Sequence, residues 1–440
     1  MKTHGHPAAK RRREGGQIIP LVALWIVVLI PFVGLSIDLG FAYIAKAQLS
    51  KAVDAAALAG ISNYYQKAPA PQNIAISTFN ANFEPTGTLP SRYASVNGPT
   101  NTFSTAANGN ETIQVQASTT LNTFFIRMLP AIGGANWNTL TVGDTGQATR
   151  SPVIMTLVLD HSYSMDPNCN LPEGCTYGGT YLPNAVADFI SDFEDTVDKA
   201  AVVAFGSTVT TLLPMSQPFI NQVKQVTAAG TIVWGGGTDS VGGLTNALVI
   251  ENSVVSTQAY VKAVVFFTDG QANMIEATSA CPTGVNQPWN FGGYLPPGQE
   301  QVSFWPTNMP DTYAAQETGE TCTTPGCCSA TADRYQSFDG TWKNFAMSNV
   351  VYDATNRCIL VANQMRAAGI YVYCIGFNVG GAGNTDVPDP GFLQQVANDP
   401  LSPSYNPALP VGAALVAGNG ADLDQLFQQI AGDIELRLTQ

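Results

Sequence analysis

Five oxygen-bearing residues in the C-terminal two-thirds of the chain have the types and order of a cation site. The segments are a DxSxS triplet in LVLDHSYSM, then WGGGTDS, then VVFFTDGQ, and the residues are Asp160, Ser162, Ser164, Thr238 and Asp269. Two carboxylates and three hydroxyls are hard oxygen donors, which suit Mg²⁺ or Mn²⁺ with water filling the remaining octahedral positions. The pattern therefore predicts one bound divalent cation.

The runs before Asp160 and Asp269 predict how these residues come together. Both runs are apolar and β-branched and end abruptly in small polar residues, as strands buried on both faces of a parallel sheet do. Groups at the carboxyl ends of such strands meet at one edge of the sheet, where open α/β folds bind ligands. The alternative is that Asp160 and Ser162 only cap turns and helices. That would explain one segment but not the set of three.

Apolar runs and helical patterns alternate along the second part of the chain. The expected strands are Val153–Leu159, Ala200–Phe205, Lys262–Thr268 and Ile370–Ile375. The expected helices are Asn184–Val197, Phe219–Ala228, Val241–Asn252, Val351–Ala368 and Leu423–Leu438. This alternation predicts an α/β fold with a doubly wound, mostly parallel sheet. The helix from Val241 would begin beside Thr238, with its positive end near the metal-bound anion.

The three segments together resemble the metal-ion-dependent adhesion site of the von Willebrand factor type A family. In that family DxSxS supplies an Asp and two Ser, the second loop a Thr, and the third an Asp. The resemblance implies a Rossmann-like domain over residues 151–440. It also implies that some ligands reach the metal through water and that the carboxylate of a partner protein completes the shell.

The N-terminus has the pattern of a membrane anchor. A basic cluster, Lys10–Arg13, precedes the uncharged apolar run 18–37. About 20 residues are needed to span a bilayer as a helix, and a helix there tolerates the kink expected at Pro31. The basic side should stay in the cytoplasm as the tail 1–17, which places the chain from Asp38 onward across the membrane. The alternative is a cleaved signal peptide.

The residues that follow continue as an Ala-rich, helix-favouring segment, 38–62. Together with RRREGGQ, DLG, AVDAAALAG and the C-terminal IAGDIELRLTQ, it resembles TadE/TadG-like proteins of the Flp (tight-adherence) pilus machinery. The resemblance implies a single-pass accessory protein of the bacterial inner membrane, with other pilus-assembly components as partners and a periplasmic or extracellular C-terminal domain. Prepilin processing needs Glu five residues after Gly, but Pro20 and Leu21 follow Gly15 and Gly16 at that distance, so no such cleavage is expected.

Two further segments have distinct compositions. Residues 63–150 contain short alternating runs such as ETIQVQAST, separated by Asn, Gly and Pro, and predict a small β-rich, pilin-like domain packed on the helix. A stalk of hairpins is the alternative. The insertion 270–345 must leave the sheet on the metal face. Its aromatic residues could contact a partner protein or pack into a local core, and the third alternative is that the insertion is disordered. These residues are Trp289, Phe291, Tyr294, Phe304 and Trp305.

Cysteine use indicates an oxidising compartment, because all eight cysteines lie beyond the apolar run. Cys169 and Cys175 would close a small loop just after the DxSxS turn. Cys358 and Cys374 would pair with each other or with the insertion. A zinc cluster is not favoured, because no His and no C-x₂-C spacing accompany the insertion cysteines, which are Cys281, Cys322, Cys327 and Cys328.

Charge and motifs narrow the function. The net charge is −13 and the dense basic cluster is confined to the N-terminus, so nucleic-acid binding is not expected. The chain has 3 His, of which only His161 lies outside the tail, and it lacks a nucleophile elbow and a Walker A loop. We therefore expect that the protein is not an enzyme. Two classes remain: an accessory protein of pilus assembly, or a surface adhesin that binds an acidic group of a host or neighbouring-cell protein through the metal.

Overall fold

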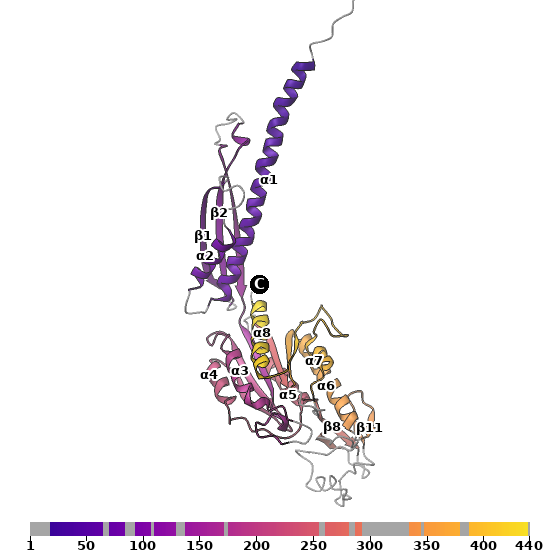
Figure 1. Cartoon of the computed structure of the whole chain (residues 1–440). Helices are drawn as coiled ribbons and strands as arrows, with labels where there is room; N and C mark the ends of the chain where they lie inside the picture. Colours follow the sequence, from indigo (N-terminus) through magenta and orange to yellow (C-terminus); the bar gives the residue numbers. More distant parts are fainter. Residues whose placement is uncertain are drawn as a thin grey trace, which may run out of the picture. The chain divides into compact units, whose positions relative to one another are not determined.

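The chain divides into two compact units in the computed structural model (Figure 1). The first contains residues 1–105 and 111–149, and the second contains 106–110 and 150–440. The structure describes residues 18–64, 70–83, 93–106, 110–128, 137–170, 175–254, 260–280, 287–292, 334–344, 347–378 and 387–438.

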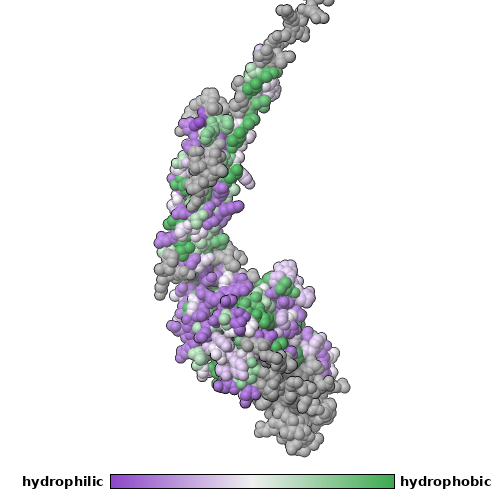
Figure 2. Space-filling view, in the orientation of Figure 1, coloured by the Kyte–Doolittle hydropathy of each residue, from purple (hydrophilic) through white to green (hydrophobic). Residues whose placement is uncertain are grey.

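The first unit contains one long helix, α1 (Ile18–Ser62), whose two halves differ in how far their side chains are buried. Up to Ile37, its described apolar side chains are mostly exposed, and Figure 2 shows this hydrophobic surface along the upper part of α1. Among the described residues, one helical stretch, Phe32–Ser62, is long and apolar enough to cross a membrane by length and composition. Beyond Asp38, however, one face of α1 is buried at helical spacing, through Ala42, Ala45, Leu49, Ala52, Val53, Ala56, Ala57 and Ile61.

That buried face packs against a three-stranded sheet in the order β1-β2-β3. The strands are β1 (Tyr93–Thr105), β2 (Glu111–Asn122) and β3 (Thr139–Arg150). Along β2 the buried positions alternate with more exposed ones, as expected for a strand with one face on a core. A helix that the sequence did not suggest, α2 (Pro71–Asn82), adds Ala75 and Phe79 to this core.

The second unit is built on a six-stranded sheet in the order β13-β12-β7-β4-β5-β6. All described pairings are parallel except that of β5 with β6. The mostly parallel α/β sheet predicted from the sequence is therefore confirmed. Its strands are β4 (Val153–Asp160), β5 (Lys199–Phe205), β6 (Val209–Ser216), β7 (Val261–Thr268), β12 (Ile370–Phe377) and β13 (Ala414–Ala417).

Helices cover both faces of this sheet, and each face has its own apolar core (Figure 1). One face carries α5 (Ser240–Ser253), α6 (Met347–Ala367) and α7 (Pro390–Ala397). The other carries α3 (Leu182–Ile190), α4 (Ile220–Val226) and α8 (Gly420–Leu438). Strand β4 is buried along its whole length between the two layers. The double cover explains why its sequence is an unbroken apolar run.

Helix α3 is shorter than the sequence suggested, because it ends at Ile190 and not at Val197. The following residues form turns in which side chains take the backbone N–H groups. The Asp198 carboxylate accepts the N–H of Glu194 at 2.8 Å and the N–H of Val153 at 2.9 Å. Asp198 also forms a buried ion pair with Arg150, with a shortest N–O distance of 2.7 Å. These bonds fix the start of β4 and compete with continuation of the helix.

The insertion contributes a separate four-stranded sheet in the order β11-β10-β8-β9. Its strands are β8 (Met274–Ala280), β9 (Gln287–Gly292), β10 (Arg334–Gln336) and β11 (Trp342–Asn344). Trp289 and Phe291 lie in β9. The other three aromatic residues singled out in the insertion, and its four cysteines, lie outside the described residues. Recognition by this segment stays a prediction.

The four described cysteines behave in two ways. Cys169 and Cys175 form a disulfide, as the sequence suggested. Cys358 on α6 and Cys374 on β12 are free, buried thiols, so the expected pairing was wrong. Both are side chains of the apolar core between α6 and the sheet, and burial raises the pKa of each thiol. A protonated thiol in such a core acts as a small hydrophobic group.

Candidate metal site

Two neighbouring strands bring the two predicted carboxylates together. Strands β4 and β7 run parallel, with Leu159 opposite Phe267, so Asp160 and Asp269 follow at the same edge of the sheet. Both aspartates are fully buried. The Thr268 hydroxyl donates to Asp160 Oδ2 at 2.7 Å and links the two strand ends directly.

The DxSxS turn adds the two serines to this pair. The Ser162 N–H donates to Asp160 Oδ1 at 2.8 Å, which turns the chain back toward β7. A short 3₁₀-helix, Tyr163–Met165, then places the Ser164 hydroxyl 3.1 Å from that of Ser162. Both hydroxyls donate to Asp269 Oδ1, at 3.3 Å from Ser162 and 3.0 Å from Ser164. Four of the five predicted residues thus form one hydrogen-bonded cluster.

Thr238 is held at the same edge through its backbone. The glycine-rich loop before it pairs with the DxSxS turn, since Tyr163 N–H donates to the Gly236 carbonyl at 3.2 Å and Gly235 N–H to the His161 carbonyl at 2.9 Å. Gly236 has a φ of +78°, a conformation that glycine adopts without strain. The three predicted segments therefore converge, with Thr238 held at this edge through its backbone N–H and carbonyl.

Asn273 is a supporting residue that sequence reasoning missed. Its Oδ1 accepts the Thr238 N–H at 2.7 Å, and its own N–H donates to the Thr238 carbonyl at 3.2 Å. Next to Thr238, Asp239 caps α5 by accepting the Gly242 N–H at 2.9 Å. The predicted helix start beside Thr238 is thus correct, and the cap satisfies one of the free N–H groups of the first turn.

Thr176 is a second residue that the sequence did not single out. Its hydroxyl is hydrogen-bonded to Asp269 Oδ2, and its N–H donates to the Ser164 carbonyl at 3.0 Å. Thr176 directly follows Cys175, whose disulfide with Cys169 closes the loop. The two oxygens of Asp269 are therefore held from different sides, one by the serines and one by this stapled loop. Only the spacing of the cysteines hinted at this role.

The electrostatics of the cluster suit a cation. Burial raises the pKa of the Asp160 carboxyl, while hydrogen bonds from Ser162 and Thr268 and the nearby charge of His161 act in the opposite direction. A divalent cation would favour the charged form that burial disfavours. Within the described part of the chain, no three His, Cys, Asp or Glu residues gather as a metal cluster. A cation here would thus depend on hydroxyl and water oxygens as well as the aspartates, which fits Mg²⁺ or Mn²⁺.

Tyrosine side chains lie on the DxSxS turn and on the loop that leads from it to α3. Tyr177 is 44% exposed and Tyr181 is 42% exposed, and the Tyr163 hydroxyl donates to Asn170 Oδ1 at 2.9 Å.

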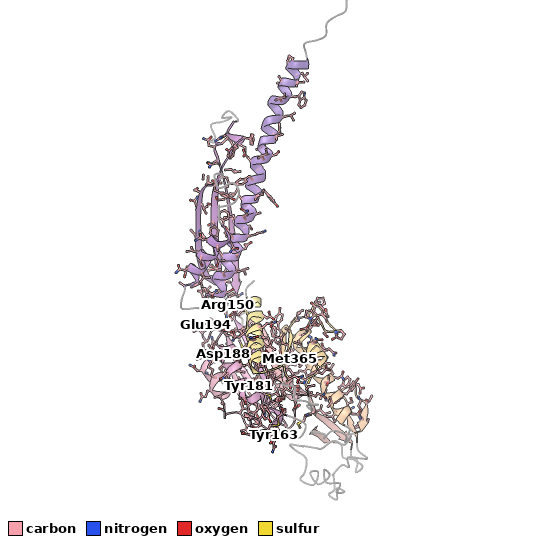
Figure 3. The ribbon with its side chains drawn as sticks, viewed as in Figure 1. Arg150, Tyr163, Tyr181, Asp188, Glu194 and Met365 are labelled. Carbon is pink, nitrogen blue, oxygen red and sulfur yellow. A yellow bond between two sulfur atoms is a disulfide. The ribbon has the colours of Figure 1, made fainter. Side chains whose placement is uncertain are left out.

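In Figure 3, Tyr163 and Arg150 lie at opposite ends of this unit. The cluster therefore lies at the far end of the sheet from the point where the chain enters it.

The helix at the N-terminus matches a known family. Residues 16–67 fit the family model described as "Putative Flp pilus-assembly TadE/G-like". This end of the chain is TadE/G-like. The matched residues include all of α1, both its exposed apolar half and the half that packs on the sheet. No curated protein matches the chain.

Solved structures with a similar arrangement include three pilus proteins. The pilus adhesin SpaC from Lactobacillus rhamnosus GG is 12% identical, with a TM-score of 0.41 over 79% of this chain and 35% of SpaC. The PilB minor pilin from Streptococcus sanguinis is 14% identical, with a TM-score of 0.41 over 78% of this chain and 79% of PilB. The vWF domain of the type V pili tip protein Mfa5 from Porphyromonas gingivalis is 17% identical, with a TM-score of 0.39 over 66% of this chain and 97% of that domain. This chain thus spans about a third of the length of SpaC.

Proposed function

We propose that the protein is a membrane-anchored accessory component of Flp/Tad pilus assembly that captures a protein ligand through a Mg²⁺- or Mn²⁺-dependent site. The observation that carries the proposal is the hydrogen-bonded cluster of Asp160, Ser162, Ser164 and Asp269 at the ends of β4 and β7. It occurs in a chain whose N-terminal helix is TadE/G-like. The TadG-like assignment within that family is part of the proposal.

Residues 18–37 are the proposed membrane anchor. The described side chains of this part of α1 are mostly exposed and apolar, whereas the face from Ala42 to Ile61 is already used by the sheet. A lone apolar helix surface of about 20 residues suits a lipid environment. The basic cluster Lys10–Arg13 would keep the N-terminus in the cytoplasm and place the second unit in the periplasm or outside the cell.

In the proposed site, Asp160, Ser162, Ser164, Thr238 and Asp269 hold the metal, some of them through water. The metal, when bound, supplies positive charge that attracts a carboxylate of the ligand protein. Asn273 and Thr176 fix the orientations of Thr238 and Asp269 before the ligand arrives. Tyr177 and Tyr181 offer exposed aromatic surface for the remainder of the contact.

Binding rather than catalysis is proposed because the histidine beside the cluster lacks the setting of a general base. His161 packs against Gly206, where an added Cβ would lie 2.9 Å from the imidazole. Its Nδ1 is buried without a hydrogen-bond partner in the described structure. A catalytic imidazole needs a group that sets its tautomer and aims it at the reacting proton.

Thermal unfolding of the fragment 148–440 tests the metal site. Mg²⁺ or Mn²⁺ at about 100 times its Kd should stabilise the fragment by ~2.7 kcal/mol, because the ion binds only the folded state. Asp160→Ala should abolish the shift and keep the fold. Asp188→Ala, which removes an exposed aspartate of α3, should retain it. The proposal is contradicted if the ion shifts neither the wild type nor the control, or shifts all three equally.

The same site would serve the alternative function of a surface adhesin. The exposed Tyr177, whose N–H donates to the Ser164 carbonyl at 3.2 Å, favours a protein ligand in either case. A bacterial strain that carries Asp160→Ala separates the two functions. Loss of assembled pili in that strain would support the accessory role, whereas normal pili with lost adherence to host or neighbouring cells would support the adhesin.

A further inference from the structure

A carboxylate on α1 fixes the tip of the first unit's sheet at one level of the helix. The sheet tip is defined here as Thr123–Arg127, after β2, together with Trp137, before β3. Asp38 is 4% exposed, and its carboxylate accepts the N–H groups of Phe124 at 3.2 Å, Phe125 at 2.9 Å and Ile126 at 3.0 Å. These bonds satisfy N–H groups at the start of a short 3₁₀-helix. Asp38 directly follows the apolar run 18–37, so the tip is attached where that run ends.

The tip also reaches past the end of the apolar run. A Cβ placed on Gly34 would overlap the Phe125 side chain, so the phenylalanine lies directly on the helix backbone there. Gly34 precedes Asp38 by four residues, which is ~6 Å along a helix. Part of the sheet tip therefore lies beside residues that the proposed anchor places within the bilayer.

The outer side of the tip has the composition of a membrane interface. Phe124 is 39% exposed and Trp137 is 44% exposed. Two bonds hold the chain segments that carry them together, since the Thr123 N–H donates to the Asn138 carbonyl at 3.0 Å and the Thr123 hydroxyl donates to the Trp137 carbonyl. The guanidinium of Arg127 lies 5.5 Å from the centre of the Phe124 ring. Aromatic rings beside a long basic side chain favour the zone between lipid tails and phosphates.

We infer that the sheet tip inserts into the surface of the bilayer that α1 enters, with Phe124 and Trp137 among the lipid headgroups and Arg127 at the lipid phosphates. This inference rests on the proposed membrane anchor. Lipid is the occupant because the tip is held on α1 at Gly34 and Asp38, within the same stretch of helix in which Phe32, Val33 and Ile37 are exposed. The protein thus contacts the membrane at two places, which fixes the depth of the helix and its rotation about its own axis.

Photo-crosslinking of the full chain in vesicles tests this contact. A benzophenone amino acid replaces Phe124, Trp137 or, as the control, Ser104, in vesicles of phosphatidylethanolamine and phosphatidylglycerol. Ser104 lies at the other end of the sheet, because it is opposite Thr112 whereas Tyr93 is opposite Leu121. Nine residues along β2 correspond to ~30 Å. We expect lipid adducts, detected by mass spectrometry, at positions 124 and 137. At position 104 we expect none.

Flotation with the vesicles reports the anchor separately from the tip. A protein that does not float has lost the anchor, and both proposals fail. A protein that floats but gives protein adducts or none at positions 124 and 137 keeps the anchor and overturns the tip contact. Equal lipid labelling at Ser104 also overturns it. Because positions 124 and 137 are tested in separate variants, misfolding of one does not remove the test.

Discussion

At the residue scale, Glu251 predicts how stability depends on pH. This buried carboxyl on α5 accepts the Thr156 hydroxyl at 2.7 Å, and burial raises its pKa to about 8. The folded protein holds the Glu251 proton more tightly than the unfolded chain does, so this proton stabilises the fold. The stabilisation is complete below the pKa that Glu251 has in the unfolded chain, and it is lost as the pH rises toward 8. We expect the unfolding free energy of fragment 148–440 to fall between pH 5 and 8, and Glu251 alone contributes at most ~1.4 kcal/mol per pH unit to this fall.

Glu251→Gln should flatten that fall, because a neutral side chain of the same shape has no proton to lose. Denaturant unfolding at pH 5, 6.5 and 8 measures it. Some slope should remain from Glu435, whose pKa is raised to about 7 by burial and by Asp192. An unchanged slope in the Glu251→Gln variant would show that Glu251 is not the group responsible.

A second residue-scale prediction concerns the hydroxyl of Thr176, which is hydrogen-bonded to Asp269. Thr176→Val keeps the shape of the side chain and removes this bond. If the proposed metal site is real, Mn²⁺ should bind ~10-fold more weakly, the lower end of typical losses for residues that orient metal ligands. Thr180→Val, at an exposed threonine of the same loop, is the control and should bind normally. Isothermal titration of fragment 148–440 measures both, and equal affinities would contradict this role for Thr176.

At the scale of elements, Asp38 predicts how firmly the sheet tip is held on α1. Asp38→Ala leaves three backbone N–H groups without their acceptor, and each unsatisfied buried donor costs ~1–3 kcal/mol. Hydrogen exchange of the full chain in detergent micelles should speed up at Phe124, Phe125 and Ile126. Exchange near Ile113, at the end of β2 away from the tip, should change little. Uniform acceleration across the sheet would mean that Asp38 holds the whole unit together.

The sequence predicts the elements whose boundaries depend on local signals. Strands β4 and β7 end where their apolar runs end, and so the cluster at Asp160 and Asp269 could be predicted. Helix α3 could not be bounded, because its end depends on Asp198, which is bonded to Arg150 across 48 residues. Thr176 and Asn273 were missed for the same reason, since nothing local marks their partners. The free thiols of Cys358 and Cys374 show that an even number of cysteines does not by itself predict which of them pair.

At the scale of the whole molecule, the division of α1 predicts that the chain can be separated from the membrane. The described core of the first unit begins at Ala42, and the tip is attached at Asp38, so a variant that starts at residue 38 keeps both. It should fold and elute without detergent as one species in size-exclusion chromatography. Vesicle binding should be weak, because only the sheet tip would remain to contact lipid, and Phe124→Ser should weaken it further. An aggregated product would mean that residues 18–37 contribute to the folded core, which would contradict their role as a lipid-facing anchor.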